Sequence, residues 1–227
     1  MRRHWFAAFL TLTAAFGLKL AYSRAGAAEL EWVLGPSCWL ARQLGGLELT
    51  HEVGAGWITH RPRMVVGPAC AGVNFLVVSW LALFFSAGRR RGLGWCVGSL
   101  LLAYVATLGT NALRIVLAAR LYELPLYAGW LTPARLHRLL GVVLYCSVLF
   151  GLCRVGSGRT RLAPLYWYAG VMIGVPLLNR SFLRDPAQFA EHTAMTLGVG
   201  LALLLAFRLI GRFVDRLSWS SWPSPKS

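Results

Sequence analysis

The chain has 227 residues, of which 57% are hydrophobic and only 14% are charged. A soluble domain of this size exposes far more charge, so the composition excludes an ordinary soluble protein. The net charge of +15 does not indicate nucleic-acid binding, because the basic residues lie in short clusters between apolar runs, where the positive-inside rule of membrane proteins accounts for them.

Six apolar runs predict an all-α fold, a polytopic membrane bundle that forms one domain over residues 1–227. The first run follows Met1-Arg2-Arg3, as a signal peptide does, but no clean cleavage site follows it directly, so we favour a retained span. The fifth run is short and contains Pro176. In chain order, the expected transmembrane helices cover about residues 5–22, 70–87, 93–119, 136–152, 165–178 and 193–210.

The segment 29–66 is the only sizeable piece that we expect outside the membrane, and we interpret it as a small outer cap. Its first half has the spacing of an amphipathic interfacial helix, which Gly35-Pro36 should break early. Its second half alternates like a strand over 47–53, turns at 54–56 and returns over 57–60.

Lys and Arg residues favour one orientation of this bundle, since they are concentrated on the short segments of one side. We therefore expect both termini in the cytoplasm of a bacterium, the spans in its inner membrane, and the cap outside. The loops of this topology place three chemically capable residues, Cys70, Arg114 and His137, near the outer ends of three different spans.

Each of these residue types suits acyl transfer. Pro68 is typical of a helix's first turn, where Cys70 would be stabilised as a nucleophilic thiolate. Arg114 stays charged at any pH and can stabilise an oxyanion. His137 can take a proton from a thiol and give it to a leaving amine.

Each residue also has a simpler interpretation, which the sequence leaves open. Cys70 could be packed in the core or form a disulfide with Cys38, and Arg114 could extend to the lipid headgroups. His137 could be an interfacial residue without a role, and its neighbour Arg138 could take part in the chemistry or merely anchor the helix. The sequence has no Cys/His spacing typical of a metal site, and we expect neither a metal nor a cofactor.

Three short motifs in this order resemble the exosortase/archaeosortase family. They are Ala69-Cys70-Ala71-Gly72 at a span start, Asn111-Ala112-Leu113-Arg114-Ile115 in the next span, and His137 with Gly141 at the start of the following one. The resemblance covers a catalytic core of about residues 65–152. The usual acidic residue and Cys-Ser-Gly at the nucleophile are replaced here by Gly67-Pro68-Ala69-Cys70-Ala71-Gly72, and the chain is short, similar to a compact subclass such as exosortase K.

The resemblance implies a membrane cysteine protease and transpeptidase that cleaves a C-terminal sorting signal from exported proteins. It assigns Cys70 as nucleophile, Arg114 to charge stabilisation and His137 to proton transfer, and some members carry arginine at the third position, which makes Arg138 a rival to His137. The substrate-binding residues stay open, with Asn111 and Arg138 as candidates. Its partners would be the exported substrate and the lipid bilayer. The alternative is a non-enzymatic membrane component of a surface polysaccharide or protein export system.

Overall fold

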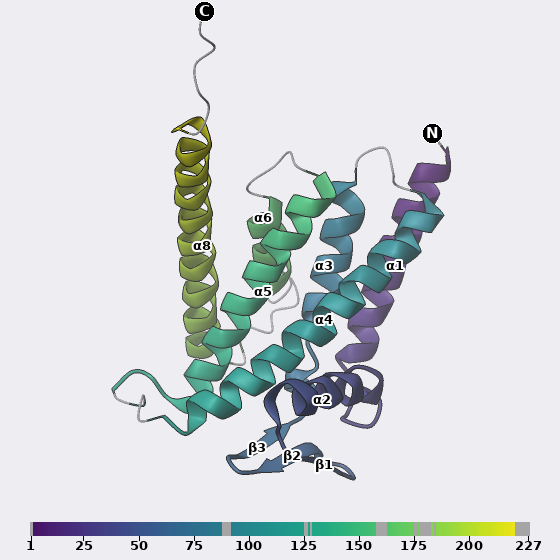
Figure 1. Ribbon diagram of the computed structural model, residues 1–227. Coiled ribbons are helices and arrows are strands. Elements are labelled where there is room, and N and C mark those ends of the chain that lie inside the picture. Colours follow the sequence, from purple (N-terminus) through teal and green to yellow (C-terminus); the bar gives the residue numbers. More distant parts are fainter. Residues whose placement is uncertain are drawn as a thin grey trace, which may run out of the picture.

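The computed structural model describes residues 2–87, 92–124, 127, 129–157, 163–174, 177, 183 and 185–220. Among them, five helices are long and apolar enough to cross a membrane. This confirms a mostly helical fold, compatible with a membrane-spanning bundle. The five lie as a bundle in Figure 1 and are α1 (Arg2–Tyr22), α3 (Val73–Ser86), α4 (Leu93–Tyr122), α5 (Pro133–Ser157) and α8 (Pro186–Ser220).

The prediction of a sixth transmembrane helix over residues 165–178 is wrong, although α5 ends opposite the cap and α8 begins at the cap end, so that α1 begins and α8 ends at the same end of the bundle (Figure 1). The region around residues 165–178 holds the helix α6 (Ala163–Ala169), which has only 7 residues, followed by the single π-helical turn η3 (Gly170–Gly174). A transmembrane helix needs about 20 residues, and the two glycines that bound η3 weaken a regular helix there. Pro176 lies outside the described residues.

The helix α3 forms the centre of the bundle. It packs against α1, α4, α5 and α6, and 72% of the residues in its span, Pro68–Ser86, are buried, against no more than 39% in any other span. It is also apolar on all sides, as expected of a helix without a solvent or lipid face. The other spans present large exposed apolar side chains, such as Phe9, Leu101 and Leu201, on surfaces suited to lipid.

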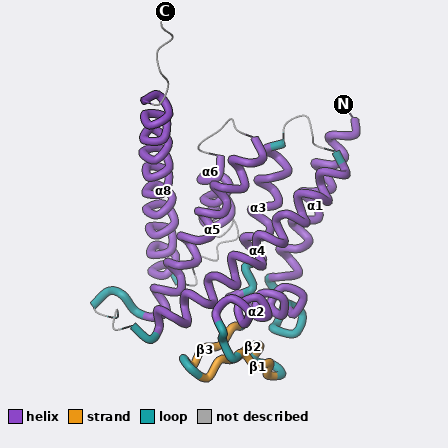
Figure 2. The backbone as a smooth tube through the Cα atoms, in the orientation of Figure 1, coloured by secondary structure: helices purple, strands orange, loops and turns teal. Residues whose placement is uncertain are grey.

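The cap lies at one end of the bundle and contains the helix α2 and a three-stranded antiparallel sheet (Figure 2). The strand and turn expected over residues 47–60 are confirmed as β1 (Leu49–Glu52) paired with β2 (Gly56–His60), and β3 (Arg63–Val66) adds a third strand that was not expected from the sequence.

The helix α2 (Glu31–Gly45) corrects a second expectation, because it runs unbroken through Pro36. Proline at this position removes the bond to the carbonyl of Trp32, and a side chain of α4 donates to that carbonyl instead. The helix is fastened to α4, where Tyr104 donates to the carbonyl of Trp32 at 2.6 Å and Arg120 to that of Gly45 at 2.7 Å.

The beginning of α1 and the end of α8 lie at the end of the bundle opposite the cap (Figure 1). The chain passes from β3 directly into α3, so the start of the central helix lies at the cap end. The end of α4 and the start of α5 lie at that end as well. The elements that carry the three candidate residues therefore meet beneath the cap.

Candidate active site

Cys70 closes the 3₁₀ turn η1 (Pro68–Cys70) that joins β3 to α3. Its amide donates to the carbonyl of Gly67 at 2.8 Å. The residue is therefore not in the first turn of α3, as the sequence suggested, but precedes that helix by a tight connection. Gly72 completes the connection with a φ of 69°, and a Cβ there would lie 2.6 Å from Oδ1 of Asn111. Both the dihedral and the close approach require glycine.

Arg114 is buried on α4, with a relative exposure of 8%. Its Nη1 donates to the hydroxyl of Tyr145 at 2.9 Å. The neighbouring helix gives it room, because a Cβ at Gly141 would lie 3.3 Å from Nε of Arg114. Both terminal nitrogens are bonded within the bundle, to Tyr145 and His137, whereas the buried Nε has no partner among the described residues. This arginine is therefore part of the bundle interior and does not extend to the headgroups.

His137 connects the other two residues. Its Nε2 lies 3.5 Å from Sγ of Cys70 and 2.5 Å from Nη2 of Arg114. A guanidinium has donors but no acceptor, so Nε2 must accept the bond from Arg114. The imidazole is then neutral and carries its proton on Nδ1. The structure thus brings together all three residues that the sequence placed at one depth.

Tyr145 is a member of this cluster that sequence reasoning missed. Its hydroxyl accepts from Arg114 and donates to Oδ1 of Asn111 at 2.5 Å. The side-chain amide of Asn111 in turn donates to the carbonyl of Ala71 at 2.7 Å. One chain of hydrogen bonds therefore runs from the residue after Cys70 to the guanidinium, and it fixes α3, α4 and α5 relative to one another.

A spacing in the sequence could have revealed Tyr145. His137, Gly141 and Tyr145 follow one another at intervals of four residues, which places them on one face of a helix. Asn111 and Arg114 share a face of α4 in the same way. Asn111, a candidate for substrate binding, uses both groups of its amide within the protein and is buried at 1% exposure.

Arg138, the rival for the third position, is placed differently from His137. Its Nη1 lies 3.9 Å from Oε2 of Glu191 on α8, whereas the imidazole of His137 contacts both Cys70 and Arg114. Arg135, one turn earlier, makes the closer pair with Glu191, with Nε at 2.7 Å from Oε1.

The remaining cysteines are separate from this cluster. None of the five cysteines is in a disulfide, so the bond between Cys38 and Cys70 is not formed. Cys38 is buried in α2, and burial raises the pKa of its thiol to about 12, with smaller contributions from the charges of Glu31 and Cys70. It is therefore a protonated thiol at neutral pH.

No metal site competes with this interpretation within the described part of the chain, where no three His, Cys, Asp or Glu side chains are grouped to hold an ion. The two histidines of the cap also lie elsewhere: His51 is on β1, 3.7 Å from Oε2 of Glu31, and His60 ends β2.

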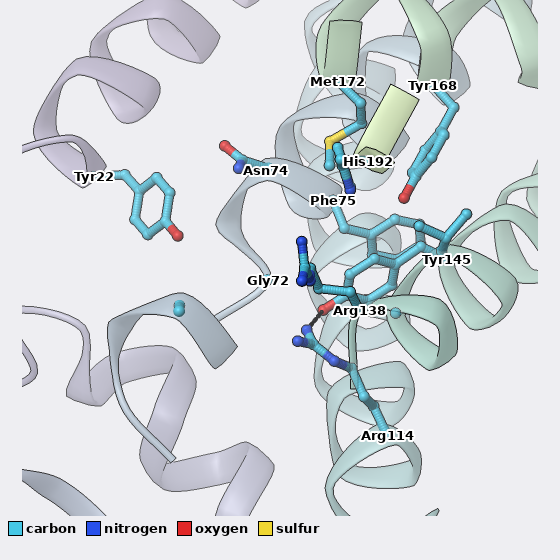
Figure 3. Close-up of a pocket in the computed structure, with 13 residues that line it drawn as sticks. Tyr22, Gly72, Asn74, Phe75, Arg114, Arg138, Tyr145, Tyr168, Met172 and His192 are labelled. Atoms are coloured by element: carbon cyan, nitrogen blue, oxygen red, sulfur yellow. Dashed lines mark hydrogen bonds between the residues drawn. The ribbon is translucent and has the colours of Figure 1, made fainter. Parts of the chain in front are cut away.

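A cavity of about 160 Å³ lies beside the cluster. Figure 3 shows Arg114, Arg138, Asn74 and His192 around it, with aromatic side chains between them. Ala69 and Gly72, which flank Cys70 at one and two residues' distance, also line it.

Comparison with known proteins adds no relative: no family model, curated protein or solved structure matches this chain. The resemblance drawn from the three short motifs therefore stays a prediction.

Proposed function

We propose that this chain is a membrane-embedded cysteine endopeptidase and transpeptidase of the exosortase type. The observation that carries the proposal is the convergence of a thiol, an imidazole and a guanidinium at Nε2 of His137. These are the nucleophile, the proton carrier and the charge stabiliser of acyl transfer. Following the resemblance, the substrate is an exported protein with a C-terminal sorting signal.

In the first half of the reaction, Sγ of Cys70 attacks the carbonyl carbon of the scissile peptide bond. The thiol proton passes to Nε2 of His137, and the carbonyl oxygen becomes an oxyanion that Arg114 stabilises. Collapse of this intermediate breaks the C–N bond. His137 returns its proton to the leaving amine, and the substrate remains on Cys70 as a thioester.

The hydrogen bond between Arg114 and His137 makes activation of the Cys70 thiol depend on bound substrate. A neutral imidazole has one lone pair on Nε2, and Arg114 occupies it in the free protein. A bound carbonyl oxygen offers Arg114 a second acceptor, and its move there frees Nε2 to take the thiol proton. Tyr145 holds the other terminal nitrogen, Nη1, at 2.9 Å during this exchange, so the guanidinium pivots without leaving the site.

In the second half, an acceptor amine attacks the thioester carbon. The C–S bond breaks, a new amide forms, and the thiol is regenerated with a proton returned through His137. Water as acceptor gives a carboxylate and simple proteolysis. Under this proposal the site lies on the outer face of a bacterial inner membrane, beneath the cap, with both termini cytoplasmic.

The test compares the C-termini of all exported proteins in cells that carry the wild-type chain or a Cys70→Ala, His137→Ala or Arg138→Ala variant, by mass spectrometry of membrane and surface fractions. Because every exported protein is surveyed, the substrate does not have to be chosen in advance. We expect the Cys70 and His137 variants to accumulate proteins that retain an apolar span and a basic tail. Identical C-termini in wild-type and Cys70→Ala cells would reject the protease and favour a non-enzymatic export component. Retained tails with Arg138→Ala but normal processing with His137→Ala would assign the third position to Arg138.

A further inference from the structure

The cavity beside Cys70 lies toward the cap end of the bundle. All five membrane-crossing helices contribute to it, four of them within seven residues of their cap end and α4 through Arg114, eight residues before its last residue. Tyr22 is the last residue of α1, Asn74 the second of α3, Arg138 the sixth of α5 and His192 the seventh of α8. At about 1.5 Å per residue these side chains start within roughly 10 Å of their helix ends, where the hydrocarbon core meets the headgroup layer.

The charges around the cavity are not balanced. None of the described residues that line it is acidic, whereas two of them, Arg114 and Arg138, are arginines. The nearest carboxylate, Glu191, is already paired with Arg135 at 2.7 Å and lies 3.9 Å from Arg138. The three permanent positive charges of Arg114, Arg135 and Arg138 thus lie near a single carboxylate, that of Glu191. An ionised Cys70 would balance only one of the two that remain.

Arg138 also has unused hydrogen-bonding capacity. Its Nη1 is buried and has no hydrogen-bond partner in the described part of the chain. The amino group of Lys19 donates to Oδ1 of Asn74 at 2.5 Å, so the NH₂ of Asn74 is the donor group of that amide. His192 adds an imidazole from the opposite wall (Figure 3). Buried donors without acceptors are costly, so the cavity is suited to an anion that accepts several hydrogen bonds.

The rest of the lining is apolar or aromatic, including Phe75, Val142 and Met172. Met172 belongs to the π-helical turn η3. A cavity with cationic groups on an apolar, aromatic wall matches an amphiphile whose charged group and hydrocarbon are joined, more closely than it matches a free inorganic ion.

From these observations we propose that the cavity binds the phosphodiester of a membrane lipid headgroup, held by Arg138 with His192 and Asn74. Guanidinium groups bind phosphate oxygens in pairs of charge-assisted hydrogen bonds, and the lipid phosphate is the anion always present at this depth. Binding here requires no reaction at Cys70, so it stands independently of the proposed protease activity.

The test is native mass spectrometry of the whole protein, purified in an uncharged detergent and titrated with short-chain phosphatidylglycerol. Diacylglycerol with the same chains serves as the lipid without phosphate, and inorganic phosphate and an acidic peptide serve as competitors. The variants are Arg138→Gln, Arg138→Lys, and Arg24→Gln. The last is the matched control, since Arg24 is exposed at the same end of the bundle and does not line the cavity.

We expect Arg138→Gln to weaken phosphatidylglycerol binding about tenfold or more, as loss of a charge-assisted pair should. Arg138→Lys keeps the charge but not the planar guanidinium, so its affinity for phosphatidylglycerol should lie between those of Arg138→Gln and wild type. If Arg138→Gln unfolds, Arg138→Lys is compared with wild type in its place. Arg24→Gln should stay within about twofold of wild type. Cys70→Ala should bind like wild type, which separates this proposal from the enzymatic one.

Three results would overturn the proposal. The first is equal binding of phosphatidylglycerol by wild type and Arg138→Gln or, if Arg138→Gln does not fold, by wild type and Arg138→Lys. The second is binding of diacylglycerol as tight as that of phosphatidylglycerol, since then the phosphate contributes nothing. The third is displacement of the lipid by an equal concentration of inorganic phosphate or acidic peptide, since the cavity would then be a site for a free anion or a substrate carboxylate.

Discussion

The polar groups in the two halves of the bundle are used in different ways. Away from the cap, buried hydroxyls such as those of Ser79 and Thr107 donate to carbonyls of their own helix at 2.7 Å. The bonds between helices there go mostly to the backbone, as from Nε1 of Trp80 on α3 to the carbonyl of Cys96 on α4 at 3.1 Å. Beneath the cap, the polar side chains bond across helices. Arg114 on α4 reaches Tyr145 and His137 on α5.

Hydrogen bonds within one helix and hydrogen bonds between helices have different consequences for the site. A hydroxyl bonded to its own helix is satisfied wherever the helix goes, so it says little about the neighbouring helices. Bonds across helices are made only in one arrangement, and they hold reactive groups in a fixed geometry. Cys70 belongs to the second half, whereas Cys96 belongs to the first, where it lies on α4 in an apolar cluster with its Sγ 3.2 Å from the hydroxyl of Thr11.

The two cysteines offer the sharpest contrast. Cys70→Ala removes the proposed nucleophile and should lower processing of the exported substrate by at least about 10⁴-fold, with little change in stability, since Cys70 is only partly buried. Cys96→Ala should leave processing intact and cost about 1 kcal/mol for the lost sulfur contacts. For both variants, processing is measured from the C-termini of the exported substrate and stability from thermal unfolding. Equal activities would remove the distinction between the halves.

Arg114→Gln should have the next largest effect. Loss of one donor to an oxyanion typically costs about 10²–10³ in kcat, and Gln cannot supply the charge. Measured turnover with a cleavable tail should fall by that amount at unchanged Cys70 labelling. Full activity in this variant would mean that Arg114 is structural only.

Tyr145→Phe tests the hydrogen bonds that cross the helices. It leaves a buried donor on Arg114 and a buried acceptor on Asn111 without a partner, at an expected cost of about 1–3 kcal/mol in unfolding free energy, together with a lower kcat at similar KM. The control is Ser79→Ala, which removes a buried hydroxyl bonded within α3 and should cost about 1 kcal/mol or less. Equal losses in the two variants would contradict the distinction.

Cys38 gives the smallest expected signal, because it should not react at all. Its pKa of about 12 lies above the usual range, so the thiol stays protonated until the pH approaches that value, and at pH 9 roughly one molecule in a thousand is ionised. A membrane-impermeant thiol reagent should therefore label Cys70 alone between pH 7 and 9, as located by peptide mapping. Labelling of Cys38 in that range would show that α2 opens from the bundle.

The sequence predicted the depth of the site but not its lateral arrangement. Hydropathy placed Cys70, Arg114 and His137 near the same ends of their spans, and the structure brings them together. Which helices lie side by side depends on the packing of many apolar side chains. Hydropathy along one chain does not contain that information, and for this reason Tyr145 was missed.

Boundaries near polar residues were the other source of error. The last span was expected from residue 193, whereas α8 begins at Pro186, so Glu191 and His192 fell outside the expected helix. Charged residues in the first turns lower the local hydropathy although the helix continues. The same averaging of hydropathy along the chain led to the prediction of a span over the apolar residues around α6 and η3.

The central claim is that Cys70 forms a thioester with the substrate. Its most direct test is intact-mass analysis of the wild-type chain after rapid acid quenching during turnover, with a parallel sample treated with neutral hydroxylamine. We expect an adduct on the peptide that contains Cys70, removed by hydroxylamine, and no adduct in Cys70→Ala. If processing continues in cells while no adduct forms at Cys70, or if Cys70→Ala carries the same adduct, the account of this site as a cysteine transpeptidase is contradicted.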